Sequence, residues 1–209
     1  MGCDIHMYTE FKHDGQWKNC DHFMFNPSFD PTRCKSFLSS QYQLVPFFDD
    51  RNYDLFSVLA NVRNYANTDY IDNHRGLPEN VTLYVKSEYE DWELDAHSAS
   101  YFTLKELIDF HNENHPIKRC GMFAPEDLEA FDKYGTIPNT YCQYTNQPGW
   151  ERRTWETKND VLTPIIEKLK ERADEVGLIY SFKWTASEMA QQEAYEKSAD
   201  IRIVFWFDN

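Results

Sequence analysis

A nearly continuous apolar run, ADIRIVFWF, occupies residues 199–207 and constrains the fold more than any other segment. Such a run is typical of a buried strand. Residues 3–11, CDIHMYTEF, alternate instead, and this period of two predicts a strand with one buried face and one polar face. Asp14-Gly15 then predicts a hairpin turn. Because each apolar strand needs neighbours, we expect the two segments to pair in one sheet.

Helical periodicity dominates the sequence between these two strands. In RNYDLFSVLANVRN, residues 51–64, the apolar side chains share one helical face, and Asp49 or Asp50 can cap its start. Thr103 and Glu106 form a T-x-x-E capping box. Further helices are expected over residues 79–92, 104–114, 125–133 and 158–176, and a strand over 178–184. Strands near both ends of the sequence with helices between them predict an α+β fold, with residues 1–209 in a single domain.

The charge of the chain limits what it can bind. Its 209 residues carry a formal net charge of −14, which opposes non-specific nucleic-acid binding because phosphates require a basic surface. No apolar stretch reaches about 18 residues, so we expect no membrane partner. The five cysteines include no C-x-x-C pair, which predicts free thiols instead of a structural zinc site. A small anionic ligand in a locally basic pocket and docking onto a basic protein both stay open.

Asp4, His6 and His97 are candidate catalytic residues. On a strand Asp4 and His6 face the same way, about 6–7 Å apart, so they can share a metal ion or act as an acid–base pair. His97 precedes Ser98 in the polar segment DAHSAS, where it can act as a catalytic or ligating group. The alternative is structural, with a satisfied histidine in the core and turn or capping chemistry at 95–100. We expect Asp4, His6 and His97 to meet at one cleft, with Ser98 as a ligand contact.

Arg51, with its neighbour Asn52, and Arg75 are candidate ligand-binding residues. Each arginine shortly precedes an expected helix, and a helix N-terminus beside a guanidinium forms an anion site. The alternative is that each arginine pairs with one of the 35 carboxylates. We expect Arg51 and Arg75 to border one concave, locally positive pocket.

Established catalytic motifs do not decide between these possibilities. The sequence has no P-loop, no G-x-G-x-x-G and no G-x-S-x-G. HNENH, residues 111–115, departs from the zinc motif H-E-x-x-H because its glutamate is displaced and Pro116 ends the helix.

Five blocks occur together along the chain: MGCDIH, RNYDLFSVLANVRN, RGLPENV, HSASYFTLKEL and RIVFWFDN. Together they resemble a family of uncharacterised proteins that are encoded mainly by bacteriophages and prophages. Residues 20–45 and 117–155 match nothing in that family. The resemblance implies an accessory phage protein in the host cytoplasm, where such proteins often interfere with host processes, including nucleotide-based immune signalling. It implies no catalytic residue.

Three functions fit these observations. The first is a metal-dependent phosphodiesterase or nuclease that degrades a host nucleotide signal, with Asp4, His6 and His97 holding a divalent metal or moving a proton. The second is a non-catalytic protein that sequesters a small nucleotide-like ligand through arginines and stacked aromatic rings. The third is an acidic protein that docks on a basic host protein.

Overall fold

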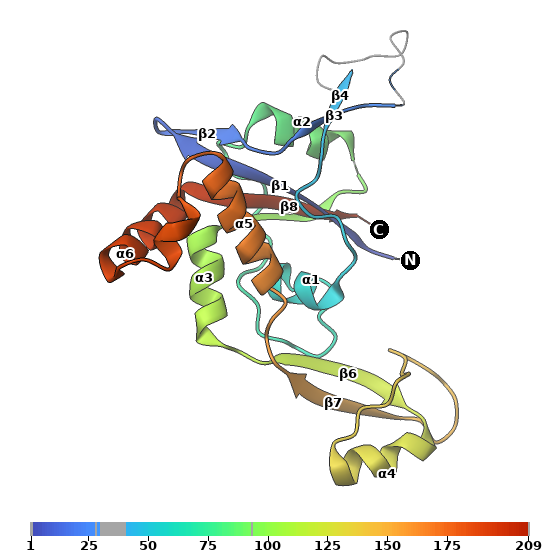
Figure 1. Cartoon of the computed structure of the whole chain (residues 1–209). Coiled ribbons are helices and arrows are strands. Elements are labelled where there is room, and N and C mark those ends of the chain that lie inside the picture. Colours follow the sequence, from blue (N-terminus) through green and yellow to red (C-terminus); the bar gives the residue numbers. More distant parts are fainter. Residues whose placement is uncertain (1, 28, 30–40, 93, 209) are drawn as a thin grey trace.

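The computed structural model describes residues 2–27, 29, 41–92 and 94–208 of the chain (Figure 1). Its strands are β1 (Asp4–His13), β2 (Gln16–Asn19), β3 (Phe23–Phe25), β4 (Tyr42–Leu44), β5 (His97–Thr103), β6 (Ile117–Phe123), β7 (Glu151–Thr157) and β8 (Ile201–Asp208). Its helices are α1 (Tyr53–Ala60), α2 (Leu83–Asp91), α3 (Leu104–Glu113), α4 (Pro125–Tyr134), α5 (Thr163–Glu175) and α6 (Glu188–Lys197), with 3-10 turns at Ser181–Trp184 and Ser198–Asp200. The main sheet is antiparallel, in the order β2-β1-β8-β5.

Strands β1 and β8 lie side by side at the centre of the main sheet. Ile5 is opposite Phe207 and Tyr8 is opposite Val204, so the predicted pairing of the two segments is confirmed. The α+β class with helices packed on this sheet is confirmed as well. Strand β8 is central in the sheet and packs in an apolar cluster on each face, so its residues from Ile201 to Phe207 are all buried, which explains the nearly continuous apolar run.

Both faces of the main sheet are covered, whereas the alternation in β1 predicts one polar face. Helices α1, α3 and α5 lie on one side and α2 lies on the other (Figure 1). Phe205 and Phe207 belong to the larger apolar cluster on the first side, and Trp206 belongs to a smaller cluster with Val85 of α2. Tyr8 of β1 packs in that smaller cluster, so only part of the expected polar face reaches solvent.

Local sequence patterns predict most turns and helices correctly but place the ends of these elements less accurately. Asp14 and Gly15 both have positive φ, 51° and 75°, as a tight hairpin turn between β1 and β2 requires. The Thr103–Glu106 capping box of α3 is present in full. The expected strand over 178–184 is wrong, because this segment follows α5 directly and forms a 3-10 turn over Ser181–Trp184.

A second hairpin, β6–β7, together with α4 and residues 141–143 forms a separately packed part of the domain, here called the β6–β7 lobe. It projects away from the main sheet in Figure 1. Its aromatic rings pack on one another, with Phe123 5.0 Å from Phe131 and 5.4 Å from Trp155 between ring centroids. The strands escaped sequence analysis because IKRCGMF and ERRTWET alternate poorly and carry several charges.

Asp21 is a buried carboxylate beside β1, and it gives stability a defined dependence on pH. Its two oxygens accept hydrogen bonds from the Thr9 hydroxyl and backbone N–H at 2.5 and 2.6 Å. Burial nevertheless raises the pKa of Asp21 to about 6. A carboxyl whose pKa is higher in the folded state stabilises the fold at low pH, and this contribution is lost as the pH rises through 6.

We therefore expect the unfolding free energy of the wild type, relative to Asp21→Asn, to fall by about 2 kcal/mol between pH 4 and pH 7. Urea denaturation of both proteins at intervals of one pH unit measures this difference. A difference that is constant or rises with pH contradicts the expectation.

Candidate functional site

Asp4 and His6 lie on one face of β1, as expected, but each is held by a different partner. Asp4 accepts hydrogen bonds from Arg51 at 2.7 and 2.6 Å, and these hold the pKa of Asp4 below its usual value. His6 Nε2 lies 3.3 Å from Oδ2 of Asp208, and its ring lies 4.1 Å from that of Trp92. The Asp4 backbone N–H donates to Asp208 Oδ1 at 3.1 Å. These contacts tie the neighbouring ends of β1 and β8 together.

His97 lies on the opposite face of the main sheet from His6, so the predicted cleft of Asp4, His6 and His97 is not formed. His97 is opposite Phe207 in the register and His6 is opposite Trp206, and consecutive residues of a strand face opposite sides. The ring of His97 accordingly lies 6.0 Å from that of Phe207. The prediction failed because His97 begins strand β5, where we expected a loop.

Ser98 serves the local geometry of β5. It adopts φ 51° at a β-bulge, and its hydroxyl lies 3.0 Å from His97 Nδ1. His97 Nε2 is buried and has no hydrogen-bond partner within the described part of the chain. A ligand contact at Ser98 stays a prediction.

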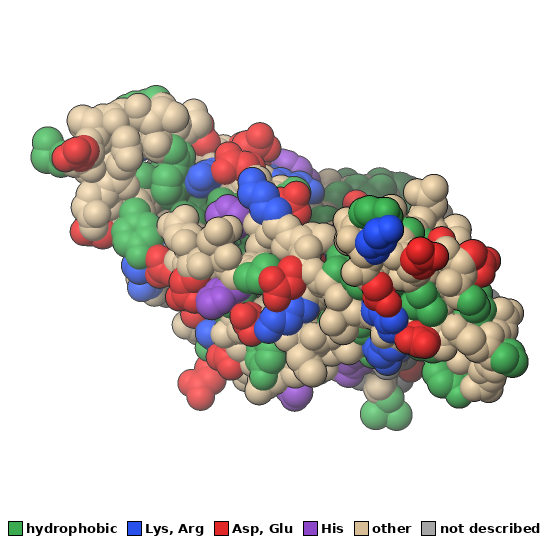
Figure 2. All heavy atoms as spheres, turned by 90° about the horizontal axis from the view of Figure 1, so that it is seen from below, with side chains coloured by type: hydrophobic (Ala, Val, Ile, Leu, Met, Phe, Trp, Pro, Cys, Tyr) green, Lys and Arg blue, Asp and Glu red, His purple; other side chains and the backbone are tan. Residues whose placement is uncertain are grey.

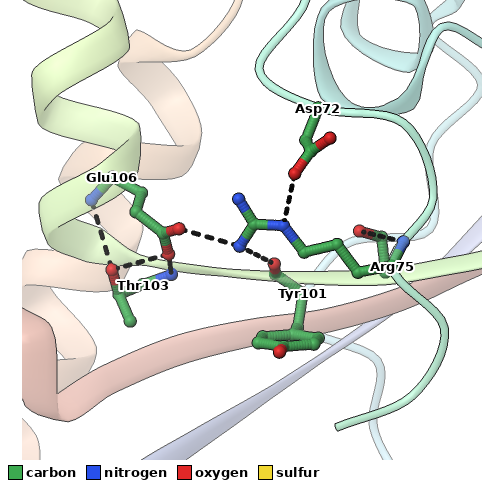
Figure 3. A network of polar contacts seen from close by, with 6 residues as sticks. Asp72, Arg75, Tyr101, Thr103 and Glu106 are labelled. Carbon is green, nitrogen blue, oxygen red and sulfur yellow. Dashed lines mark hydrogen bonds and ion pairs between the residues drawn. The ribbon is translucent and has the colours of Figure 1, made fainter.

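Arg75 joins three parts of the fold (Figure 3). Its guanidinium donates to Asp72 at 2.8 Å, to Glu106 at 2.7 Å and to the Tyr101 carbonyl at 3.3 Å. Glu106 also completes the capping box of α3, so Arg75 ties the 65–77 loop to β5 and to the start of that helix. The ion-pair alternative describes Arg75 better than a ligand-binding role.

Arg51 and Asn52 are likewise occupied by the fold. Arg51 donates hydrogen bonds to Asp4. The Asn52 side chain caps α1 by accepting a hydrogen bond from the backbone N–H of Leu55. The predicted caps, Asp49 and Asp50, are therefore wrong. Arg51 and Arg75 lie in separate ion pairs, so these contacts do not bring the two arginines together, and a pocket that they share stays a prediction.

A cavity of about 470 Å³ between α1, the loop after it and β6 gathers cationic and aromatic side chains. We call it the basic cavity. Its cations are Arg63, Lys118 and Arg119, and its aromatic residues are Tyr53, Tyr65 and Tyr141. Asp54 is the only carboxylate among the described residues that line it, so cations outnumber anions here in a protein of net charge −14.

Arg63 and Tyr141 are placed in the cavity by features of the backbone. Arg63 has φ 55°, an uncommon conformation for a residue with a side chain, and it donates to the Gly2 carbonyl at 3.3 Å and to the Tyr65 hydroxyl at 3.1 Å. Tyr141 packs closely against β6 at Gly121, where an added Cβ atom would lie 2.5 Å from the tyrosine ring. Non-glycine residues with φ above zero are enriched at ligand-binding sites, which makes the loop after α1 a candidate for function.

The two walls of the cavity belong to different parts of the molecule. Tyr53, Asp54 and Arg63 come from α1 and the loop after it, whereas Lys118 and Arg119 come from the β6–β7 lobe. Thr68 joins the walls, because its hydroxyl donates to the Lys118 carbonyl at 2.7 Å and accepts from the Lys118 backbone N–H at 2.8 Å. A ligand in the cavity would contact both walls.

The chemistry of the cavity suits binding of an anion. Guanidinium and ammonium groups bind phosphate, and tyrosine rings stack on flat ligands. No histidine is among the described residues that line it. Within the described ranges, no three His, Cys, Asp or Glu side chains are placed to hold a metal ion together, so Asp4 and His6 do not extend into a metal site there.

The sequence carries little sign of the residues that line this cavity. Lys118-Arg119 is a basic pair in an acidic chain, which is a weak signal, and it lies in a segment where we expected no strand. Arg63 lies in the block RNYDLFSVLANVRN but points into the cavity only because the helix ends at Ala60 and the chain turns back.

Comparisons of the chain with protein-family models, curated proteins and solved structures give no match. In the described part of the chain, every helix is too short or too polar to cross a bilayer.

Proposed function

We propose that the protein binds a small phosphate-containing, nucleotide-like ligand in the basic cavity and sequesters it unchanged. The single observation that carries this proposal is the gathering of Arg63, Lys118 and Arg119 around one cavity of an otherwise acidic protein. A volume of about 470 Å³ falls within the usual range for small-molecule sites. The three tyrosines offer faces on which a nucleobase can stack.

The metal-dependent phosphodiesterase has less support. Asp4 and His6 are bonded to Arg51 and Asp208, and His97 lies on the other face of the main sheet. Hydrolysis by activated water requires a base or a metal beside the bound phosphate. The described lining of the basic cavity offers only Asp54 for this role, and that carboxylate is bonded to Arg119.

Docking on a basic partner also has less support. Red and blue side chains are interspersed on the face seen in Figure 2, and neither sign forms a broad patch there. On α5, Glu167 pairs with Lys170 at 2.9 Å and Glu175 with Arg172 at 2.7 Å. If the phage resemblance holds, binding in the cavity would remove a signalling nucleotide from the host cytoplasm.

Replacement of Arg119 by Gln should weaken binding of ADP about 10- to 100-fold, because hydrogen bonds to a charged group contribute about 1.5–3 kcal/mol. Isothermal titration calorimetry with a panel of linear and cyclic nucleotides first identifies which of them bind. Release of the unchanged nucleotide on denaturation supports sequestration, whereas a product supports hydrolysis.

The matched control is Arg153→Gln. Arg153 pairs with Asp132 at 2.7 and 2.8 Å on the surface of the β6–β7 lobe, so this change removes the same charge away from the cavity lining. We expect it to leave the affinity unchanged. Equal losses in both variants would assign the effect to net charge and would reject the cavity as the binding site.

A further inference from the structure

Within the basic cavity, the guanidinium of Arg119 is already occupied by a carboxylate. Its Nε donates to Asp54 Oδ2 at 3.0 Å, and a terminal nitrogen donates to the same oxygen at 2.6 Å. Asp54 lies in the first turn of α1 and Arg119 lies on β6, so the pair spans the two walls. Both side chains are about one-third exposed, so solvent and a ligand can reach them.

An anionic ligand must compete with this contact. Asp54 holds the edge formed by Nε and a terminal nitrogen, which is one of the two edges through which a guanidinium can bind a phosphate with two hydrogen bonds. A carboxylate that stays in the cavity also repels the ligand, because like charges a few ångströms apart interact strongly in partly buried surroundings. A phosphate that takes this edge must displace Asp54, and the apparent affinity of that binding mode is the intrinsic affinity multiplied by the fraction of molecules in which Arg119 is free of Asp54.

We propose that Asp54 is a built-in competitor for the ligand, which occupies Arg119 until a phosphate displaces it. This inference rests on the proposed function and names the residue that regulates the same site. A phosphate has the charge and the oxygen atoms to replace both hydrogen bonds of the carboxylate, whereas a neutral ligand has no comparable means of releasing Arg119. Asp54 thus restricts the cavity to anions and prevents Arg119 from being left unpaired.

The test is the affinity of the full chain for ADP and for inorganic pyrophosphate, measured by calorimetry on Asp54→Asn. We expect binding about tenfold tighter than in the wild type. Asp132→Asn is the matched control, because it removes the same charge from the equivalent pair with Arg153 outside the cavity, and it should leave the affinity unchanged. Asp54→Ser provides a second variant if Asp54→Asn proves unstable in thermal melts.

A double-mutant cycle shows whether the effect passes through Arg119. In an Arg119→Gln background, Asp54→Asn should give a smaller gain than in the wild type, because no guanidinium remains to be released. If Asp54→Asn binds more tightly than the wild type only when Arg119 is present, the result supports Asp54 as a competitor for the ligand. Binding by Asp54→Asn where the wild type shows none also supports it. Unchanged or weaker binding by Asp54→Asn while the wild type binds overturns this inference and leaves the proposed function intact. Absence of binding in every variant overturns both.

Discussion

A chain that lacks residues 203–209 will not fold. The deletion removes most of β8, the strand that separates β1 from β5, so β5 loses its neighbour in the main sheet and β1 keeps only the short β2 there. It also removes Ile203, Val204 and Phe205 together with Trp206 and Phe207, all of which have 0% exposure. Each side chain of this size contributes about 1.5–3 kcal/mol when fully buried, so the summed loss approaches the whole stability of a typical domain.

Circular dichroism and thermal melting of the truncated chain measure this effect directly. A cooperative transition in the truncated chain would contradict the central place of β8. Phe207→Ala gives a graded version, with an expected loss of about 3–5 kcal/mol. Phe182→Ala is its matched control, because Phe182 is 63% exposed and the same change there should stay within about 0.5 kcal/mol.

The second large effect concerns the buried ion pair between Glu10 of β1 and Arg202 of β8. Arg202 donates to Glu10 Oε2 at 2.7 and 2.6 Å, and the two side chains are only 3% and 0% exposed. Glu10 Oε1 accepts from the Thr82 backbone N–H at 2.7 Å, Asn80 accepts from Arg202 at 2.9 Å, and Trp17 lies 3.9 Å from the guanidinium. Both charged side chains therefore have several hydrogen-bonding partners. These partners explain how Glu10 and Arg202 can be buried in otherwise apolar surroundings.

Replacement of one partner leaves the other charge buried and unpaired. Glu10→Leu and Arg202→Met should each lower the unfolding free energy by about 3–5 kcal/mol. The double variant Glu10→Leu/Arg202→Met should be less destabilised than either single variant, because no unpaired charge remains. Chemical denaturation of the three proteins measures the coupling between the two sites.

The matched control is the exposed pair between Lys12 and Asp200, 3.7 Å apart, which joins the same region of the fold. Lys12→Met should change stability by no more than about 1 kcal/mol, since solvent screens this pair. A loss at Lys12 as large as the loss at Arg202 would show that burial is not the cause.

The sequence predicts those parts of the fold that local patterns determine. The apolar run at 199–207 and the alternation at 3–11 identify the two central strands, and the T-x-x-E box locates the start of α3. The burial of Glu10 is not predictable in the same way, because its partner Arg202 is distant in the sequence. Strands β6 and β7 are stabilised chiefly by each other and by packing on α4, so their own sequences carry little strand signal.

The candidate site is less predictable than the fold. Asp4, His6, Arg51 and Arg75 have the residue types of an active site, but the structure uses them in ion pairs and contacts between strands and helices. The basic cavity combines side chains from positions 53–65, 118–119 and 141, which only the folded chain brings together. A cation in an acidic sequence has many carboxylates as potential partners, so its role depends on tertiary contacts.

The arrangement of the main sheet also determines the order in which the chain can fold during synthesis. The backbone N–H of Asp4 donates to Asp208, 204 residues away, and the central strand β8 is made after the other strands that the structure describes. At about 5–20 residues per second, a ribosome would hold β1 without its principal neighbour for roughly 10–40 seconds. Until then β1 can pair with β2 and with the short segment at Phe48, but the edge that β8 will occupy stays open to chaperones and to other nascent chains. Contacts this distant in sequence also make closure of the sheet a slow step, because loop-closure entropy must be overcome before the strands can pair.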